Sequence, residues 1–190
     1  MRPGVFLDRD GTINEQMGYI NHLSRFQLLP GVGPAIKLLN DSNIPVVVVT
    51  NQSGIARGYF PAELLIDVHD RMQELLAQEG AHIDGIYVCP HRPDAELSAY
   101  RKDCECRKPK TGLFTKAAAE LDIDLARSYV VGDRWSDVRA ARNCGAHSIL
   151  VLTGYGRGEL DYIGPKQEVQ PHWVAEDLVS AARKIVADLK

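Results

Sequence analysis

The sequence predicts an α/β protein with a doubly wound, mostly parallel sheet and helices on both of its faces. Two observations indicate this class. Short apolar runs with strand-like composition alternate along the chain with longer segments of helical spacing. Two of the apolar runs, residues 45–49 and 148–152, are hydrophobic on both faces. Such runs are typical of parallel strands that are buried between two layers of helices.

Five strands are expected, at residues 5–8, 45–50, 86–89, 129–132 and 148–152. They are rich in Val, Ile, Leu and Tyr, which favour the extended conformation. Polar side chains stand at or just after the ends of four of them: Asp8, Thr50, Cys89 and Asp133. Because ligands of open α/β sheets bind beyond the carboxyl ends of the strands, these four side chains are candidates for a shared site.

Five helices are expected, at residues 33–40, 61–78, 111–121, 136–143 and 176–189. Pro61 suits a first helical position, and Gly80 lies just beyond the end of the same helix. Residues 15–29, 90–110, 153–164 and 165–171 interrupt the pattern as irregular stretches. Residues 153–158 are glycine-rich but lack the strand–turn–helix context of a nucleotide site, so we expect a flexible loop. One domain, residues 1–190, accounts for the whole chain.

Composition and charge exclude several classes of protein. The chain is 45% hydrophobic and 25% charged, and its net charge is −3, which offers no basic surface for nucleic acid or an anionic membrane. Its longest apolar run, about residues 44–49, is far shorter than the ~20 residues of a membrane helix. The first strand begins too early to leave room for a signal peptide. We therefore expect a cytoplasmic protein, with no nucleic-acid or membrane partner, that is monomeric by default.

Asp8 and Asp10 close the first strand, one residue apart, on a Gly11-Thr12 turn. Alternate residues of an extended chain share a face, and two carboxylates this close need a cation or a proton between them. One carboxylate can attack phosphorus to form an aspartyl-phosphate, while the other transfers protons. Repulsion from Asp8 and burial are expected to raise the pKa of Asp10, which favours the acid role. Taken alone, the pair is equally compatible with an acidic turn that closes a strand.

Two further segments add groups suited to a phosphate. Thr50, with Asn51, Gln52 and Ser53 behind it, offers a hydroxyl and backbone N–H groups for phosphoryl oxygens, although the same residues are common in turns. Arg107 and Lys108 offer a planar fork and a point charge, although basic residues in a loop are usually only solvated.

Asp133 is the candidate that would join Asp8 on an octahedral Mg²⁺, which prefers one or two carboxylates together with phosphate and water. Asp137, four residues later, is expected to cap or orient the start of a helix.

These motifs, in this order, resemble the haloacid dehalogenase superfamily of phosphatases. Asp8-x-Asp10-Gly-Thr matches its first motif, Thr50 its second, Lys108 its third, and Gly132-Asp133 with Asp137 its fourth. The resemblance implies that Asp8 is the nucleophile, Asp10 the general acid/base, and Thr50 and Lys108 the groups that stabilise the phosphoryl group. It also implies that Asp8, the backbone carbonyl of Asp10 and Asp133 bind Mg²⁺. Only about 37 residues separate Thr12 from Thr50, so no large cap domain is expected.

Cys89-Pro-His91 and Cys104-Glu-Cys106 provide three thiolates and one imidazole, a set suited to tetrahedral Zn²⁺. Four protein ligands leave no open position, so the metal would be structural and would staple the excursion between the two pairs. The alternative is one buried cysteine and an unrelated exposed pair. Because Cys106 directly precedes Arg107 and Lys108, a metal here would also fix where those cations point.

Within the superfamily, residues 50–58 and 106–109 and the cysteine pattern resemble the D-glycero-D-manno-heptose-1,7-bisphosphate 7-phosphatases. This resemblance implies Mg²⁺-dependent hydrolysis of the 7-phosphate in the synthesis of ADP-heptose and lipopolysaccharide precursors. The substrate contacts then expected are Gln16, Met17, Gly18, Tyr19, Asn51, Gln52, Ser53, Arg57 and Arg107. Three alternatives stay open: a histidinol-phosphate phosphatase, a non-catalytic sugar-phosphate-binding module, and a phosphotransferase with an acceptor other than water. Arg57 favours a second phosphate over an aminoalcohol.

Overall fold

The computed structural model describes residues 1–189 and contains one six-stranded sheet in which every pairing of strands is parallel. The strands are β1 (Val5–Leu7), β2 (Val46–Asn51), β3 (Gly85–Cys89), β4 (Tyr129–Gly132), β5 (His147–Val151) and β6 (Trp173–Ala175). Their order is β3-β2-β1-β4-β5-β6. The chain therefore changes direction across the sheet between β1 and β4, and in open α/β sheets this switch point is where ligands bind.

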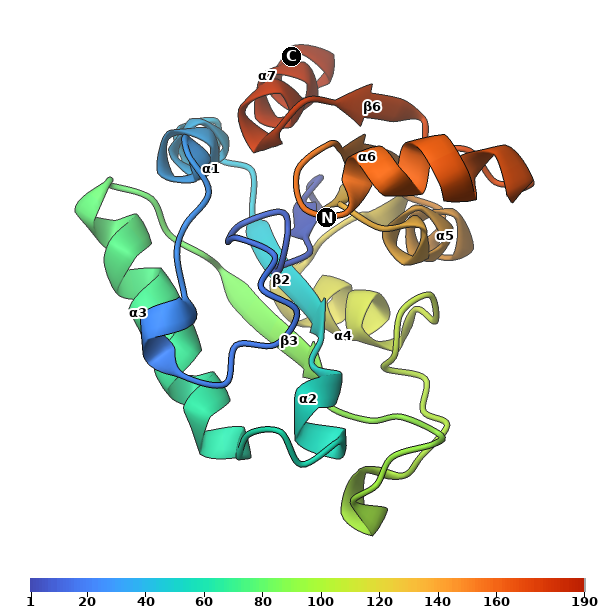
Figure 1. Cartoon of the computed structure of the whole chain (residues 1–190). Coiled ribbons are helices and arrows are strands. Elements are labelled where there is room, and N and C mark those ends of the chain that lie inside the picture. The colour runs from blue at the N-terminus through green and yellow to red at the C-terminus, as the bar shows by residue number, and fades with distance from the viewer. Residues whose placement is uncertain (190) are drawn as a thin grey trace.

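The helices form a layer on each face of the sheet (Figure 1). They are α1 (Val32–Asp41), α2 (Ser53–Ala56), α3 (Ala62–Gln78), α4 (Gly112–Leu121), α5 (Trp135–Cys144), α6 (Gly156–Gly158) and α7 (Leu178–Asp188). α1, α3 and α7 cover one face, and α4 and α5 cover the other. Single turns of 3-10 or π helix occupy Leu23–Arg25, Ser98–Tyr100, Leu125–Arg127, Glu159–Ile163 and Gly164–Lys166.

Alternation along the strands produces two hydrophobic cores. Val5 and Leu7 face the α1, α3 and α7 layer, whereas Phe6 faces α4 and packs against Phe114 with 5.4 Å between the ring centroids. β1 lies at the centre of the sheet, with Val5 in register with Val46 of β2 and Tyr129 of β4. Because all three residues of β1 are fully buried, the residues that follow it emerge at the middle of the carboxyl edge of the sheet.

The doubly wound parallel sheet without a cap domain is confirmed, with corrections of detail. The five expected strands and five expected helices are present; β4 has the expected bounds, and each bound of the others differs by at most two residues. Pro61 is the residue before α3 rather than its first residue. β6 was not expected, and residues 156–166, expected to be irregular, are mostly helical.

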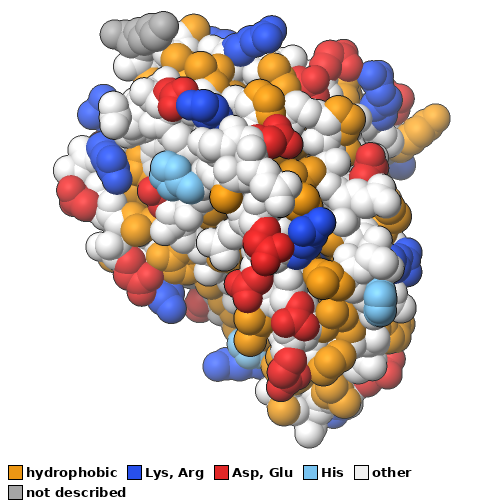
Figure 2. All heavy atoms as spheres, turned by 90° about the vertical axis from the view of Figure 1, so that its left-hand side faces the viewer, with side chains coloured by type: hydrophobic (Ala, Val, Ile, Leu, Met, Phe, Trp, Pro, Cys, Tyr) orange, Lys and Arg blue, Asp and Glu red, His pale blue; other side chains and the backbone are white. Residues whose placement is uncertain are grey.

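The surface carries both signs of charge. Figure 2, which shows the side formed by α1 and α3, has acidic and basic side chains interspersed with scattered hydrophobic ones. The exposed hydrophobic side chains include Ile66 on α3 and Tyr59 just before it. No helix within residues 1–189 is both long enough and apolar enough to cross a membrane.

Candidate active site and cysteine–histidine cluster

A cavity of about 360 Å³ opens at the carboxyl ends of the strands, beside the switch point. Acidic residues, amide and hydroxyl groups, and several cations surround it. The residues that line it are Asp8, Asp10, Gln16, Gly18, Tyr19, Thr50, Asn51, Gln52, Ser53, Arg92, Arg107, Lys108, Arg134, Ser136 and Tyr155. Groups far apart in the sequence thus meet at the edge of the sheet where ligands are expected.

Lys108 stands between two carboxylates. Its Nζ lies 2.9 Å from Asp8 Oδ1 and 2.7 Å from Asp137 Oδ1, and it donates a 2.7 Å hydrogen bond to the carbonyl of Val49. Burial disfavours the ammonium, but the charges of Asp137 and Asp8 outweigh burial and raise the pKa of Lys108. Asp137 Oδ2 also accepts the N–H of Arg134 (3.2 Å) at the start of α5, so Asp137 caps the helix as expected and holds Lys108 as well.

The carboxylate of Asp10 is held by several hydrogen-bond donors. Both of its oxygens accept from Arg9 Nη2 at 2.9 Å, and Asn14 (3.0 Å) and Gln52 (2.7 Å) donate to it through their side-chain amides. Burial alone raises the pKa of this carboxyl, but the Arg9 guanidinium and the amide hydrogen bonds outweigh burial, so the pKa of Asp10 is lowered. The expectation of a raised pKa is therefore wrong, because it considered repulsion from Asp8 and overlooked Arg9.

Asp133 is fully buried, and only one of its two carboxylate oxygens has a partner. Its Oδ2 accepts the N–H of Tyr155 at 2.9 Å, while its Oδ1 has no hydrogen-bond partner in residues 1–189. Burial and the nearby Asp8 carboxylate raise the pKa of Asp133 to about 8. Oxygens of Asp8, Asp133 and Asp137 lie within 4.8 Å of one another. An unpartnered buried oxygen in an acidic group suits a hard divalent cation such as Mg²⁺, which compensates the clustered charge.

Asn51, the last residue of β2, and Gln52, which follows it, form hydrogen bonds with other residues that line the cavity. Gln52 donates to the Thr50 hydroxyl (2.9 Å) as well as to Asp10. The side chain of Asn51 accepts the N–H of Lys108 (3.1 Å) and donates to its carbonyl (3.2 Å). Asn51 thereby ties the end of the excursion to β2 and fixes the backbone from which the Lys108 side chain extends.

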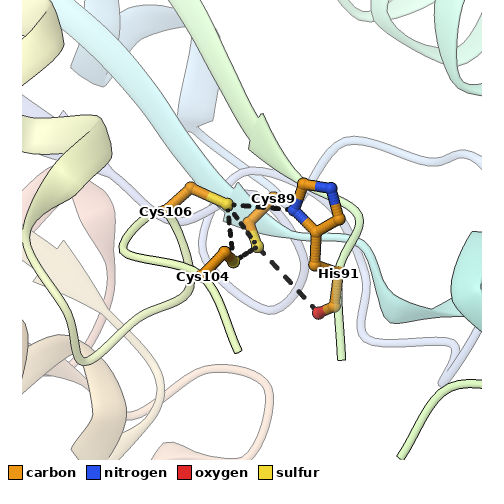
Figure 3. A group of neighbouring side chains, drawn as sticks. All are labelled: Cys89, His91, Cys104 and Cys106. Carbon is orange, nitrogen blue, oxygen red and sulfur yellow. Dashed lines mark hydrogen bonds between the residues drawn. The ribbon is translucent and has the colours of Figure 1, made fainter. Parts of the chain in front are cut away.

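The four expected metal ligands of the excursion converge at the end of β3 (Figure 3). Cys106 Sγ lies 2.8 Å from Cys104 Sγ, 3.0 Å from Cys89 Sγ and 3.3 Å from His91 Nδ1. Cys89 and Cys104 are buried, and burial raises the pKa of the Cys89 thiol. Three sulfurs and one ring nitrogen that close together, with no disulfide between them, are consistent with a tetrahedral zinc site.

The structure brings most of the expected substrate residues to the cavity, but Met17 and Arg57 are absent from its lining. The carbonyl of Met17 accepts a hydrogen bond from Arg25 at 3.1 Å, and Arg57 is the residue that ends α2.

Four cavity residues were not expected. They are Arg92, Arg134, Ser136 and Tyr155. The guanidinium carbon of Arg134 lies 4.1 Å from the centroid of the Tyr155 ring. Tyr155 lies just beyond the carboxyl end of β5, and ligands of open α/β sheets bind beyond such ends. The position of Tyr155 in the sequence could therefore have marked it as a candidate, as it did for Asp8.

Comparisons with known proteins all indicate the same family. A family model described as HAD-hydrolase-like matches residues 105–181. A D-glycero-D-manno-heptose-1,7-bisphosphate 7-phosphatase of Thermosynechococcus vestitus is 44% identical over 193 residues, covering 99% of this chain and 97% of that protein. The D-glycero-beta-D-manno-heptose-1,7-bisphosphate 7-phosphatase of Yersinia pestis is 40% identical, with 99% and 97% covered. The chain belongs to the heptose-1,7-bisphosphate 7-phosphatase family.

A solved structure of this family supports the same assignment. The D,D-heptose 1,7-bisphosphate phosphatase of B. bronchiseptica, whose crystal structure is complexed with magnesium and phosphate, is 36% identical and superposes with a TM-score of 0.86 over 99% of both chains. This heptose-bisphosphate phosphatase family thus shares the sheet, the helical layers and the absence of a cap with the fold described above.

Proposed function

We propose that the chain hydrolyses the 7-phosphate of D-glycero-D-manno-heptose 1,7-bisphosphate, with Mg²⁺ as cofactor, and that the product feeds ADP-heptose synthesis. One observation carries the proposal most directly: Asp8, Lys108 and Asp133 meet at the switch point of the sheet, on the edge of a cavity lined by further cations. Relatives with this activity in their names match the chain over nearly its full length.

The chemistry assigned to Asp8 is nucleophilic. One oxygen of its carboxylate attacks phosphorus, the bond from phosphorus to the sugar oxygen breaks, and an aspartyl-phosphate forms. Asp8 Oδ1 is held by Lys108 Nζ and by the N–H of Arg9 at 2.8 Å, which fixes the orientation of the carboxylate before attack. Mg²⁺ on Asp8, Asp133 and the carbonyl of Asp10 would neutralise charge that develops on the phosphoryl oxygens.

Asp10 is assigned to proton transfer. In the first step it gives a proton to the departing sugar oxygen, and in the second it takes a proton from the water that attacks the aspartyl-phosphate, which releases phosphate and restores Asp8. Arg9 and the two amides keep Asp10 ionised in the free site, the form required of the base. The negative charge of a bound phosphate favours the protonated form, which the first step requires.

The other cations of the cavity suit a substrate with two phosphates. Lys108, with the Thr50 hydroxyl, serves the phosphate that is transferred. Arg92, Arg107 and Arg134 line the same cavity at other points, and planar guanidinium groups bind phosphate through paired hydrogen bonds. Arg107 also donates to the carbonyl of His91 at 3.1 Å, so its position depends on the excursion.

We propose Zn²⁺ as the ion held by Cys89, His91, Cys104 and Cys106, in a structural role. The expected result is about one zinc per chain by elemental analysis. A Cys144→Ala variant is the matched control, because Cys144 lies on α5 outside the cluster and its removal should leave the zinc content unchanged. A purified protein whose four cysteines are reduced and which holds no zinc under non-chelating conditions would contradict the proposal.

A substrate panel tests the function. With Mg²⁺ present, kcat/KM is compared for both anomers of heptose 1,7-bisphosphate, fructose 1,6-bisphosphate and histidinol phosphate. The heptose bisphosphates should be preferred. Preference for histidinol phosphate would assign the chain to the sister activity instead, and absence of turnover on all substrates would indicate a binding module. Asp8→Asn should abolish activity, and retained turnover in that variant would refute the covalent route.

A further inference from the structure

The turn Thr153-Gly154-Tyr155, just beyond β5, is clamped onto the loop that carries Asp8 and Asp10. The Thr153 hydroxyl donates a 2.6 Å hydrogen bond to the carbonyl of Gly11. The N–H of Tyr155 donates to Asp133 Oδ2 at 2.9 Å. This turn therefore joins the catalytic loop after β1 to the carboxylate after β4, although it lies in neither motif.

Gly154 is the residue between Thr153 and Tyr155, and its backbone packs closely against Gly11 and Asp133. Its φ is +55°, in the left-handed region that disfavours a side chain. A Cβ on Gly154 would lie 2.2 Å from Asp133 Oδ2 and 2.6 Å from the Cα of Gly11. Gly11, with φ +84°, is as restricted, since its own Cβ would lie 2.0 Å from Asp133 Oδ2. The two glycines thus form a slot around Asp133 Oδ2 that leaves no room for a side chain on either of them.

The slot determines which oxygen of Asp133 is available. Oδ2 lies close to Gly11 and Gly154 and accepts the N–H of Tyr155, whereas Oδ1 is buried and has no hydrogen-bond partner within residues 1–189. An oxygen of Asp133 also lies within 4.8 Å of oxygens of Asp8 and Asp137. We propose that Gly154 is a positioning residue for the divalent cation: it keeps Asp133 oriented so that Oδ1 faces the cation site. This inference rests on the proposed function only in taking Asp133 as a Mg²⁺ ligand.

The same turn reaches the substrate cavity. Tyr155 lines the cavity, and the Arg134 guanidinium carbon stacks over its ring, 4.1 Å from the ring centroid. The backbone of Tyr155 thus holds the metal carboxylate while its side chain forms part of the wall. A displacement of Gly154 should therefore weaken Mg²⁺ binding first and substrate binding second.

The test is the Mg²⁺ affinity of the zinc-containing protein without substrate, measured by calorimetry and by competition with Mn²⁺ in electron paramagnetic resonance. Gly154→Ala should raise the Kd for Mg²⁺ roughly 10-fold or more, since residues that orient a ligand typically contribute that much. Saturating Mg²⁺ should restore most of kcat, which a purely structural defect would not allow. Gly158→Ala is the matched control: it lies in the same segment, has no atom within 4 Å of its added Cβ, and should keep the wild-type Kd.

Thr153→Val is a second variant, which removes the hydroxyl bonded to Gly11 while conserving shape. It should raise the Kd for Mg²⁺ by less than Gly154→Ala. Unchanged Mg²⁺ affinity in folded Gly154→Ala would overturn the inference, and if that variant does not fold, unchanged affinity in Thr153→Val would do so. Because the measurement needs no substrate, a wild type that binds Mg²⁺ but hydrolyses no heptose bisphosphate would reject the proposed function alone.

Discussion

At the scale of single residues, the charge balance of the site depends on Lys108. Its ammonium group forms ion pairs with Asp8 and Asp137 and donates a hydrogen bond to the carbonyl of Val49. A buried cation in that position separates two carboxylates that would otherwise repel each other. Under the proposed function the same group supplies positive charge to the transferred phosphoryl group, so stability and catalysis would both depend on one side chain.

Lys108→Met should therefore impair both properties. We expect kcat to fall about 10²–10³-fold, as when a preorganised charge partner of the reacting group is removed. The free energy of unfolding in urea, measured without Mg²⁺, should fall by about 3–5 kcal/mol because buried carboxylates lose their cation. Lys110→Met is the control, since Lys110 pairs with Asp103 and Glu105 at the surface. A kcat within threefold of wild type would contradict the role given to Lys108.

His69, on α3, is buried against Arg9, with 3.3 Å between Nε2 and Arg9 Nη1. Burial and then the Arg9 charge lower the pKa of His69 to about 4. The folded state thus holds a neutral imidazole, whereas the unfolded chain titrates near its ordinary value of ~6.5. The stability that His69 contributes is complete above pH ~6.5 and is lost as the pH falls toward 4.

This difference in the pKa of His69 between the folded and unfolded states predicts that the free energy of unfolding falls by roughly 3 kcal/mol between pH 7 and pH 4, since one pKa unit corresponds to about 1.4 kcal/mol. His69→Gln removes the titrating group but keeps a polar side chain. The free energy of unfolding of this variant, measured in urea at several pH values, should depend less steeply on pH over that interval than the wild type. Equal slopes for the two proteins would show that His69 does not titrate as described.

At the scale of elements, the sequence predicted what strong patterns encode. Continuous apolar runs located β2 and β5, and the polar residues at strand ends, such as Asp8 and Asp133, marked the correct edge of the sheet. β6 could not be predicted in this way, because three residues at the edge of a sheet carry no periodicity, and Trp173 is partly exposed. The position of Tyr155 in the cavity depends on contacts between distant segments, which a one-dimensional pattern does not contain. The pKa of Asp10 depends mainly on the direction in which its neighbour Arg9 points, which the sequence does not contain either.

The excursion between β3 and α4, residues 90–110, is the element that should couple zinc to turnover. Cys106 directly precedes Arg107, and the guanidinium of Arg107 donates a hydrogen bond to the carbonyl of His91, a residue of the cysteine–histidine cluster. We expect the double variant Cys104→Ala/Cys106→Ala to lose zinc and to show a lower kcat/KM, with the Mg²⁺ affinity unchanged because Asp8 and Asp133 lie on other loops.

Zinc content, kcat/KM and Mg²⁺ binding of the double variant are compared with those of Cys144→Ala, which should resemble wild type in all three. Loss of zinc with full kcat/KM would show that the excursion positions Arg107 and Lys108 without the metal.

At the scale of the whole molecule, the sheet separates two hydrophobic cores. Each strand contributes alternate side chains to the core on one face and to the core on the other. Phe114 of α4 belongs to the core on one face and Met72 of α3 to the core on the other, and both are fully buried. Since their contacts lie on opposite sides of the sheet, the effects of substitutions at the two positions should be independent.

Phe114→Ala should lower the free energy of unfolding by about 3–5 kcal/mol and Met72→Ala by about 2–5 kcal/mol, because each leaves a cavity in a close-packed core. In the double variant the two losses should add to within about 0.5 kcal/mol. Ile66→Ala, at an exposed site on α3, is the control and should change stability by less than about 0.5 kcal/mol. A large non-additive term would mean that the two layers communicate through the sheet.

The excursion is also closed upon itself at its base. The cysteine–histidine cluster joins its two ends, and the side chain of Asn51 forms hydrogen bonds with the backbone of Lys108. The backbones of Arg92 and Arg101 pair in an isolated β-bridge. Its outer part, residues 93–100, projects away from the sheet (Figure 1). That part can change in length or composition without moving Asp8, Asp10 or Lys108, because insertions are best tolerated at loop tips. Residues 93–100 are therefore the place where the chain should accept an insertion or a fused peptide at the smallest cost to the site.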